Sequence, residues 1–389
     1  MAKLIDITGK AISGEWGIDD DAGTGIPVLR TTNFTNDGVI NYNNVVTRDI
    51  QKKDLSQKFL QPGDIIIEKS GGSDKQPVGR VVYYDGEPDK FLFNNFTGAL
   101  RVRDKSVWYP RYVFYALYGN YAKGGTRRYE NKTTGLHNLK TDQYVQDFAI
   151  QEQPLEYQQQ IVARLDKITE LIALRKEQLA KLDELVKSRF IELFGKCKEQ
   201  KRLEEYAPLI TKGASPKWQG VDYCEEGTLF VTSENVREGY LDLSKRKYLD
   251  DKINEIQPRS ILKRNDILIN IVGASIGRAA VYDCDEAANI NQAVALVRVD
   301  YSQINQTYLM TFLNSPQAIE MYGKMKKGGA RDNLSLQNIA DLQIPIAPIE
   351  LQKQFAAFVE QTDKSKFVIQ QSHDKLELLK KSLMQEYFG

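Results

Sequence analysis

The sequence consists of two similar halves, and this internal repeat constrains the fold more than any other feature. "KGGTR" at Lys123–Arg127 returns as "KGGAR" at Lys327–Arg331. Further along each half, the register shifts slightly, so that Leu100 is matched with Leu296. Such a long repeat predicts two copies of one folding unit. Identical residues also recur in one constant register: Trp16 with Trp218, Gly25 with Gly227, Asn33 with Asn235, Leu60 with Leu262, and Asp64 with Asp266.

Each half ends in a segment that predicts a long helix. Residues 154–195 align with residues 348–389 without a gap, and no proline or glycine occurs between Leu155 and Phe194. Apolar residues recur there every seven positions, at Leu165, Ile172, Leu179, Val186 and Leu193. This heptad pattern indicates a coiled coil, with a helix roughly 55–60 Å long. The second copy fits as its partner, because polar residues interrupt its stripe at Thr362, Ser365, Ser372 and His373.

The remainder of each half contains short β-rich runs. Examples are "GDIIIEKS" and "GRVVYYD" in the first half, and "NDILINIVG" and "GRAAVYD" in the second. Short helical patterns follow near Tyr112–Tyr121 and Tyr308–Lys326. The predicted order is a mixed α/β domain, a long helix, a second domain and a second long helix, related by a pseudo-twofold internal repeat.

Composition narrows the functional classes. The 389 residues are 41% hydrophobic and 27% charged, as in ordinary globular proteins. No apolar run is long enough to span a membrane, so we expect no membrane partner and a cytoplasmic location. We expect free cysteines, His137 in a polar loop, and His373 on a helix surface or interface, which leaves little material for a metal site. Basic residues outnumber acidic ones between Arg101 and Lys132 and alternate with tyrosines, as on a surface that follows phosphates.

An enzymatic role is not expected. An amino-methyltransferase would need an Asp/Asn-Pro-Pro-aromatic motif, and the nearest stretch, "NSPQ" at Asn314, lacks the second proline and the aromatic residue. The nucleotide-binding pattern GxxxxGK[ST] is absent from the sequence. Glu199-Gln200-Lys201 has the spacing of a nuclease motif, but no strand is predicted around it.

Several stretches, covering essentially the whole chain, resemble the specificity subunit of Type I restriction-modification systems. They are "PGDIII", "RNDILIN", "GASIGRAAVYD", "GGARDNLSLQNIADLQIPIAP" and the helix openings "PLEYQQQI" and "PIELQKQF". In that family, two target recognition domains alternate with two long helices that pair as an antiparallel coiled coil. The resemblance implies an α/β fold with target recognition domains at residues 1–153 and 197–347. The two conserved spacer helices would occupy residues 154–196 and 348–389.

The resemblance also implies a DNA-binding chain without catalysis. Each recognition domain would read one half of a bipartite double-stranded DNA target and direct adenine methylation or restriction by partner subunits. Those partners would be two methyltransferase subunits and the restriction subunits, which would carry S-adenosylmethionine, ATP and Mg²⁺; no cofactor or metal is expected on this chain. Two alternatives remain open, a recognition subunit with a differently associated nuclease and a coiled-coil scaffold without DNA specificity.

The candidate DNA contacts lie in duplicated polar and basic loops. Glycines in each KGGxR loop would let the main chain approach a phosphate, and arginine can contact a guanine edge. Hydroxyls and amides after a strand suit base or phosphate contacts. The simpler interpretation of each loop is a surface turn. The predicted residues are Arg30, Thr31, Thr32, Asn33, Ser70, Lys75, Arg80, Lys123, Arg127 and Arg128 in the first half, and Thr232, Ser233, Asn235, Ser275, Arg278, Lys327 and Arg331 in the second.

Overall fold

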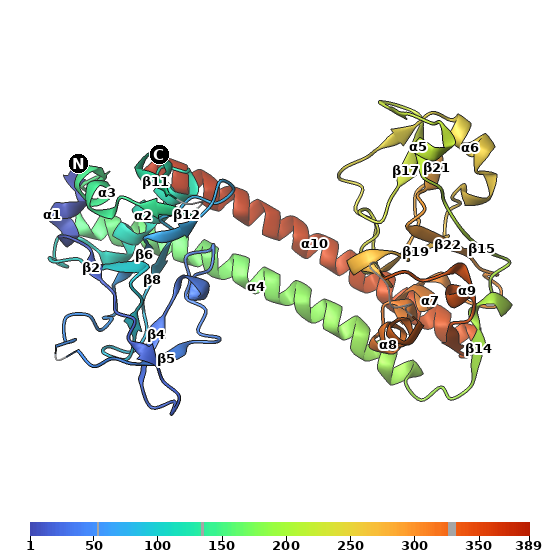
Figure 1. The fold of residues 1–389 in the computed structure, drawn as a ribbon, viewed down its shortest axis with the longest axis horizontal. Coiled ribbons are helices and arrows are strands. Elements are labelled where there is room, and N and C mark those ends of the chain that lie inside the picture. The colour runs from blue at the N-terminus through green and yellow to red at the C-terminus, as the bar shows by residue number, and fades with distance from the viewer. Residues whose placement is uncertain (53, 134–135, 326–331) are drawn as a thin grey trace. The chain divides into compact units, whose positions relative to one another are not determined.

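The computed structural model describes residues 1–52, 54–133, 136–325 and 332–389. They form two compact units (Figure 1). Unit 1 contains Met1–Arg175 and Ser372–Gly389, and unit 2 contains Lys176–Gln371. Both long helices, α4 (Leu155–Phe194) and α10 (Ile349–Phe388), therefore contribute to both units. The uninterrupted helix expected between Leu155 and Phe194 is confirmed.

The strands of unit 1 form small antiparallel and mixed sheets in the orders β1-β13, β2-β10-β6-β8, β3-β5-β4-β9 and β11-β12-β7. The helices are α1 (Leu4–Thr8), α2 (Pro110–Ala122), α3 (Thr141–Asp147) and the first part of α4. The strands are β1 (Ala2–Lys3), β2 (Ile12–Ser13), β3 (Ile18–Asp19), β4 (Ile26–Leu29), β5 (Val46–Asp49), β6 (Ile65–Glu68), β7 (Ser70–Gly72), β8 (Val81–Tyr83), β9 (Leu92–Phe93), β10 (Thr97–Leu100), β11 (Glu130–Thr133), β12 (Leu136–Leu139) and β13 (Ala149–Ile150).

Unit 2 repeats this plan with sheets in the orders β14-β23, β15-β22-β19-β20 and β16-β18-β17-β21. Its short helices are α5 (Pro216–Gln219), α6 (Lys252–Ile256), α7 (Gln306–Leu313), α8 (Pro316–Met325) and α9 (Leu336–Ala340). Its strands are β14 (Gln200–Arg202), β15 (Leu209–Lys212), β16 (Tyr223–Cys224), β17 (Thr228–Val231), β18 (Tyr248–Leu249), β19 (Ile267–Asn270), β20 (Ala279–Val281), β21 (Ala288–Ile290), β22 (Val294–Arg298) and β23 (Gln343–Pro345).

The central strand of each unit is buried on both faces, which explains its unbroken apolar sequence. In β6, Ile65 and Ile67 belong to the core that includes α2 and the long helices, whereas Ile66 faces the core beneath the second sheet. Strand β19 repeats this alternation: Ile267 faces one core and Leu268 the other. Each unit therefore has a hydrophobic core on each side of its central sheet.

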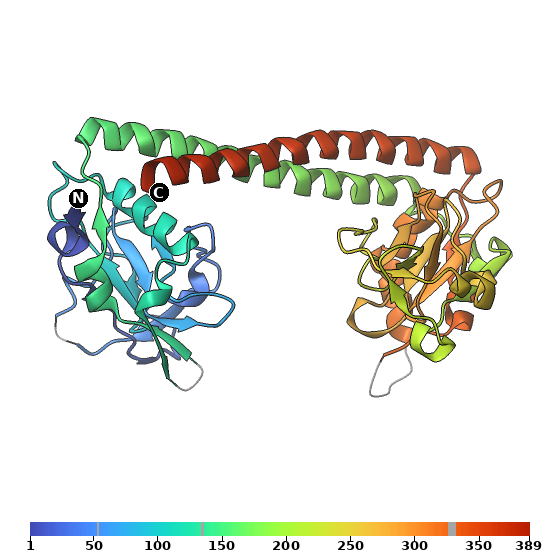
Figure 2. The same ribbon diagram turned by 90° about the horizontal axis from the view of Figure 1, so that it is seen from above.

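The long helices pair in an antiparallel manner and complete one core of each unit (Figure 2). In unit 1, the Arg164 guanidinium donates to the hydroxyl of Tyr387 at 2.9 Å. In unit 2, Lys366 forms a 2.7 Å ion pair with Asp183. The polar residues that interrupt the stripe of α10 have local uses, since Ser372 accepts a hydrogen bond from Arg175 in unit 1. The α/β fold with an antiparallel helix pair and a pseudo-twofold repeat is thus confirmed.

Strand pairing corrects the sequence register late in each repeat. Ile65 pairs with Leu100, and its equivalent Ile267 pairs with Val297. Leu100 therefore corresponds to Val297, and the expected match with Leu296 is wrong by one residue. The sequence alignment paired Leu100 with Leu296 by coincidence, because the connecting loops before them differ in length between the two halves.

Three smaller expectations have mixed outcomes. His137 does not lie in a polar loop: it is buried in β12, with Nδ1 3.0 Å from the Glu130 carboxylate. His373 is partly buried on α10, 3.3 Å from Asp374, and the three cysteines are free, as expected. Residues Gln200–Arg202 form a strand that was not predicted.

Among the described residues, no helix combines the length and apolar character needed to cross a membrane.

Candidate nucleic-acid interface

In unit 1 the predicted loops come together in one place, which we call the first loop cluster (residues 30–36, 70–80 and 123–128). The Arg80 guanidinium donates to the carbonyl oxygen of Thr31 at 3.0 Å. Arg127 donates to the carbonyl oxygen of Asp74 at 3.2 Å. The Gln76 amide donates to the Asn36 side chain at 3.1 Å. Three segments that are distant in the sequence thus form one surface of the domain.

Asn33 holds this cluster together from inside. Its side chain is 1% exposed, and Oδ1 accepts from the backbone N–H of Arg30 at 2.9 Å. Its Nδ2 donates to the carbonyl oxygens of Asn41 and Asn43. With both polar atoms engaged, Asn33 acts as a cap of the short turn Thr31–Asn33, and its geometry favours a structural role over the predicted DNA contact.

Arg80 is also directed inward. Besides the Thr31 carbonyl, it contacts the carbonyl oxygen of Phe34 at 2.9 Å and the Glu68 carboxylate at 3.2 Å. Glu68 is buried, and this burial raises the pKa of its carboxyl group, an effect that Arg80 partly offsets. Because Arg80 satisfies two carbonyl oxygens and a buried acid, it is part of the loop framework.

Several predicted residues of unit 1 remain accessible to a ligand. Lys75, Arg127, Arg128 and Thr32 are exposed, while Arg30, Thr31 and Ser70 are half-buried. The Arg128 guanidinium lies 4.8 Å from the Tyr129 ring centroid. Lys123 is exposed but donates to the carbonyl oxygen of Phe388 at 3.0 Å, so it binds the C-terminal end of α10.

Unit 2 has an equivalent second loop cluster (residues 232–236, 270–278 and 332–334). The Asn270 amide donates to the Ser233 carbonyl oxygen at 3.0 Å and to Ser275 Oγ at 3.2 Å. The Gly273 N–H donates to the Asp332 carbonyl oxygen at 3.1 Å. Arg278 is exposed. Lys327 and Arg331 lie outside the described residues.

Asn235 repeats the role of Asn33. Its Oδ1 accepts from the N–H of Thr232 at 2.9 Å and from the Thr232 hydroxyl at 3.0 Å, and its Nδ2 donates to the Asp242 carbonyl oxygen. Both Thr232 and Asn235 are buried, so this pair too has a structural role. Ser233 stays half-buried beside them.

A buried acid–arginine clamp lies at the start of the central strand of each unit and was not assigned from the sequence. Asp64 is 1% exposed and receives two hydrogen bonds from Arg101, at 2.8 and 2.7 Å. Asp266 is fully buried and receives the same pair from Arg298, at 2.7 and 2.6 Å. The identity of Asp64 and Asp266 was visible in the repeat, but the correct arginine partners required the corrected register. Arg101 is therefore internal to the framework.

Two glutamines join the long helices to the domains. Gln158 accepts from the N–H of Tyr109 at 2.9 Å, and Gln352 accepts from the N–H of Asn305 at 2.9 Å. Both glutamines are buried, and the residues that they hold begin α2 and α7. The sequence held a signal for them, because Gln158 and Gln352 are identical within the gap-free part of the repeat.

Comparison with known proteins identifies the family. The family model for the Type I restriction modification DNA specificity domain matches residues 2–184 and, a second time, residues 198–379. The chain belongs to this family. The matches cover most of both halves, so the internal repeat is a tandem pair of specificity domains.

Individual members of the specificity-domain family are more distant. The Type I restriction enzyme EcoBI specificity subunit of Escherichia coli is 31% identical over 140 residues, which are 36% of this chain and 29% of that subunit. A candidate type I restriction enzyme MjaX specificity subunit of Methanocaldococcus jannaschii is 22% identical over 361 residues, covering 86% of this chain and 80% of that protein.

Two solved structures have the same fold as this specificity-domain chain. One comes from work on complex assembly and conformational transition of the type I R-M system, with a TM-score of 0.60, 16% identity, and coverage of 100% of this chain and 96% of that chain. The other is the S subunit of the Type I restriction-modification system from M. genitalium, with a TM-score of 0.59, 14% identity, and coverage of 100% and 95%.

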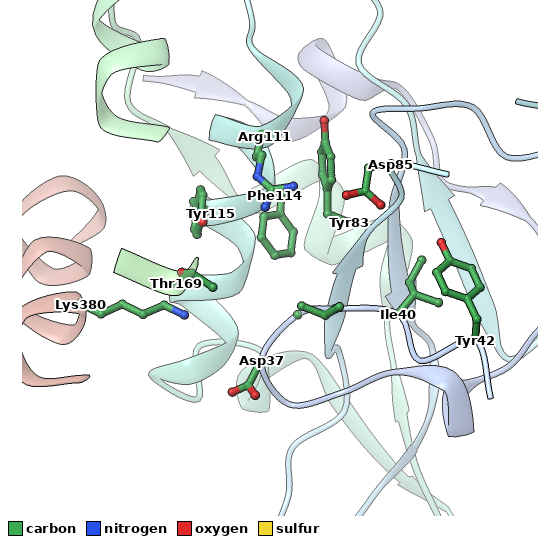
Figure 3. A pocket seen from close by; sticks show the side chains of 12 residues that line it. Asp37, Ile40, Tyr42, Tyr83, Asp85, Arg111, Phe114, Tyr115, Thr169 and Lys380 are labelled. Atoms are coloured by element: carbon green, nitrogen blue, oxygen red, sulfur yellow. The ribbon is translucent and has the colours of Figure 1, made fainter. Parts of the chain in front are cut away.

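A small cavity lies beside α2 in the first specificity domain (Figure 3). Its volume is about 80 Å³, and Arg111, Tyr115, Tyr83 and Thr169 are among its lining residues. Arg111 forms a 2.7 Å ion pair with Asp166 of α4, and burial raises the pKa of Tyr83 to about 12. Sites for drug-sized ligands and cofactors occupy roughly 300–1,000 Å³. This cavity therefore belongs to the junction of α2 with α4 and is no candidate for a nucleoside cofactor.

Asn314, the nearest approach to a methyltransferase motif, also has a structural use. Its side-chain amide donates to the Ala279 carbonyl oxygen at 2.9 Å, and its Oδ1 accepts from the Ala279 N–H at 3.0 Å. These two bonds fix the end of α7 to β20. Within the described ranges, no group of three or more histidine, cysteine, aspartate or glutamate residues is placed to hold a metal ion.

Proposed function

We propose that this chain is the sequence-specific DNA-binding specificity subunit of a Type I restriction-modification complex. Each specificity domain would read one half of a bipartite double-stranded DNA target. The observation that carries the proposal is the double match to the specificity-domain family, together with a loop cluster in each copy. Duplicated domains with similar loops suit two half-sites better than a scaffold, which would need only the helices.

The exposed groups of the loop clusters have the chemistry that DNA binding requires. Lys75, Arg127 and Arg128 place positive charge on the first cluster, and Arg278 on the second. Phosphate contacts by such residues position a protein on the duplex, and base-edge contacts in the grooves supply specificity. An exposed arginine can do either, because its guanidinium binds phosphate or two acceptors of guanine.

The chemistry would belong to partner subunits. We propose two methyltransferase subunits, which would carry S-adenosylmethionine and methylate adenine, and restriction subunits, which would use ATP and Mg²⁺. This chain would act as a guide without catalysis of its own. The structural use of Asn314 supports this assignment, since that residue has no amide group left to orient a target base.

Mapping of modified bases tests the proposal. The chain would be produced with its methyltransferase subunit in cells that lack other adenine methylation, and their DNA would be sequenced for methylated adenines. We expect one motif with two defined parts and an undefined spacer of fixed length. Absence of a motif, or a continuous motif without a spacer, would refute the bipartite reading. Mass spectrometry of proteins that co-purify with the chain then identifies the nuclease and its mode of association.

A further inference from the structure

The two domains differ at the last residue of their central strands. Glu68 ends β6, and Asn270 ends β19. Their backbones are equivalent: the Glu68 N–H donates to the Arg80 carbonyl oxygen at 2.8 Å, and the Asn270 N–H donates to that of Arg278 at 2.9 Å. An acid and an arginine face this position in the first domain, and an asparagine and an arginine occupy the equivalent positions in the second.

In the second domain, Asn270 donates the hydrogen bonds that correspond to those of Arg80 in the first. Arg80 donates to the carbonyl oxygens of Thr31 and Phe34. The Asn270 amide donates to those of Ser233, at 3.0 Å, and Val236, at 3.3 Å. The turns correspond residue by residue, because Asn33 and Asn235 cap them with the same hydrogen bonds. In the second domain, these two carbonyl oxygens are satisfied without an arginine.

The Arg278 side chain is therefore not needed to bond the carbonyl oxygens of this turn. It is exposed, whereas the Arg80 side chain is only 15% exposed. Within the part of the chain that the structure describes, the Arg278 side chain has no hydrogen-bond or ion-pair partner. Glu238 lies on the turn next to it, since the Gly239 N–H bonds the Ala279 carbonyl oxygen, but that carboxylate pairs with Lys187 at 3.0 Å.

The surroundings of Arg278 leave room for a ligand. Gly273, at the start of the same loop, has a positive φ of 76°, and no atom of the described residues lies within 4 Å of where its side chain would project. Its N–H bonds Asp332, which directly follows the KGGAR segment. An exposed arginine in a glycine-containing loop, with no side-chain partner among the described residues, is suited to bind an anionic polymer.

We propose that Arg278 contacts DNA in the half-site read by the second domain, whereas its repeat equivalent Arg80 only supports the first loop cluster. The inference rests on the proposed function and adds that identical residues of the repeat have separate roles. Asn270 is the positioning residue that makes Arg278 available.

Alanine variants test the difference in the intact complex with methyltransferase subunits. Binding to the mapped target duplex would be measured by fluorescence anisotropy at several salt concentrations, with thermal unfolding in parallel. We expect Arg278→Ala to weaken binding by roughly fivefold to a hundredfold at unchanged melting temperature. Arg80→Ala should instead lower the melting temperature, because Glu68 is left buried without its partner. Arg264→Ala is the matched control, since it removes an exposed arginine that is already paired with Asp285.

Exchange of the strand-end residues tests the cause. Glu68→Asn should release Arg80 and strengthen binding to all duplexes, with the salt slope increased by about one. Asn270→Glu should draw Arg278 inward and weaken binding as Arg278→Ala does, and a double variant Asn270→Glu/Arg278→Ala should bind no more weakly than Arg278→Ala alone.

The outcomes separate the two proposals. If the unmodified complex binds no duplex specifically, the proposed function fails. If it binds its target and Arg278→Ala binds equally well, the inference about Arg278 alone is wrong. Equal loss of affinity from Arg80→Ala at unchanged melting temperature would also overturn it, because both arginines would then contact DNA.

Discussion

The two specificity domains share a framework and differ in what they attach to it. Both have the acid–arginine clamp, the asparagine-capped turn and the buried glutamine at the start of a long helix. They differ at the strand-end residues Glu68 and Asn270. As a result, the Arg80 side chain bonds inside its domain, whereas the Arg278 side chain is exposed. Identity across the repeat thus marks the framework more reliably than it marks the binding surface.

The largest effect should come from breaking the clamp that both domains share. Asp64→Ala leaves Arg101 without its buried acid, and Asp266→Ala does the same to Arg298. We expect each variant to destabilise its own domain by about 3–5 kcal/mol. Hydrogen exchange measured domain by domain during denaturant unfolding reports the cost. A loss below about 1 kcal/mol in one domain only would show that the frameworks are not equivalent.

A smaller loss of stability should follow from replacing the two buried glutamines that join the long helices to the domains. Gln158→Ala leaves the Tyr109 N–H and the carbonyl oxygens of Val107 and Gln153 without partners. Gln352→Ala leaves the Asn305 N–H and the Ala347 carbonyl oxygen without their partners. We expect about 1–3 kcal/mol of destabilisation for each, larger for Gln158. Hydrogen exchange at the first turns of α2 and α7 measures it, and a reversed order would contradict the bond count.

The smallest effect concerns the two basic residues of the KGGTR loop. Lys123→Ala removes a charge from the end of α10 and should cost about 0.3–1 kcal/mol of stability, with little change in DNA affinity. Arg127→Ala should leave stability unchanged and weaken binding to the target duplex. Thermal unfolding and anisotropy on both variants separate the roles. Similar DNA affinities for the two variants would contradict the assignment.

The sequence predicted elements better than it predicted partners. Helix α4 could be placed because heptad periodicity and the lack of proline and glycine are local properties. The role of Arg80 could not, because it depends on carbonyl oxygens of a turn far away in the chain. The basic run from Arg101 to Lys132 illustrates the same limit: Arg101 and Arg111 are paired inside the domain, so the charge of a segment does not give the charge of a surface.

The hairpin that contains the buried His137 was missed for a related reason. Residues Glu130–Thr133 and Leu136–Leu139 are mostly polar, so they lack the alternation that marks a strand. The cross-strand contact of His137 with Glu130 stabilises the hairpin, and so does its pairing with β7, which is a tertiary effect. The candidate site could be located by its loops, but only coordinates separate framework residues from those available to a ligand.

The central claim is that each domain reads its own half of the target. The direct test replaces residues 1–153 with the equivalent domain of another specificity subunit whose target is known, and maps methylated adenines in cells that carry the hybrid. We predict a motif in which one half changes to that of the donor while the other half stays the same. A change in both halves, or an unchanged motif, would contradict independent reading by the two domains.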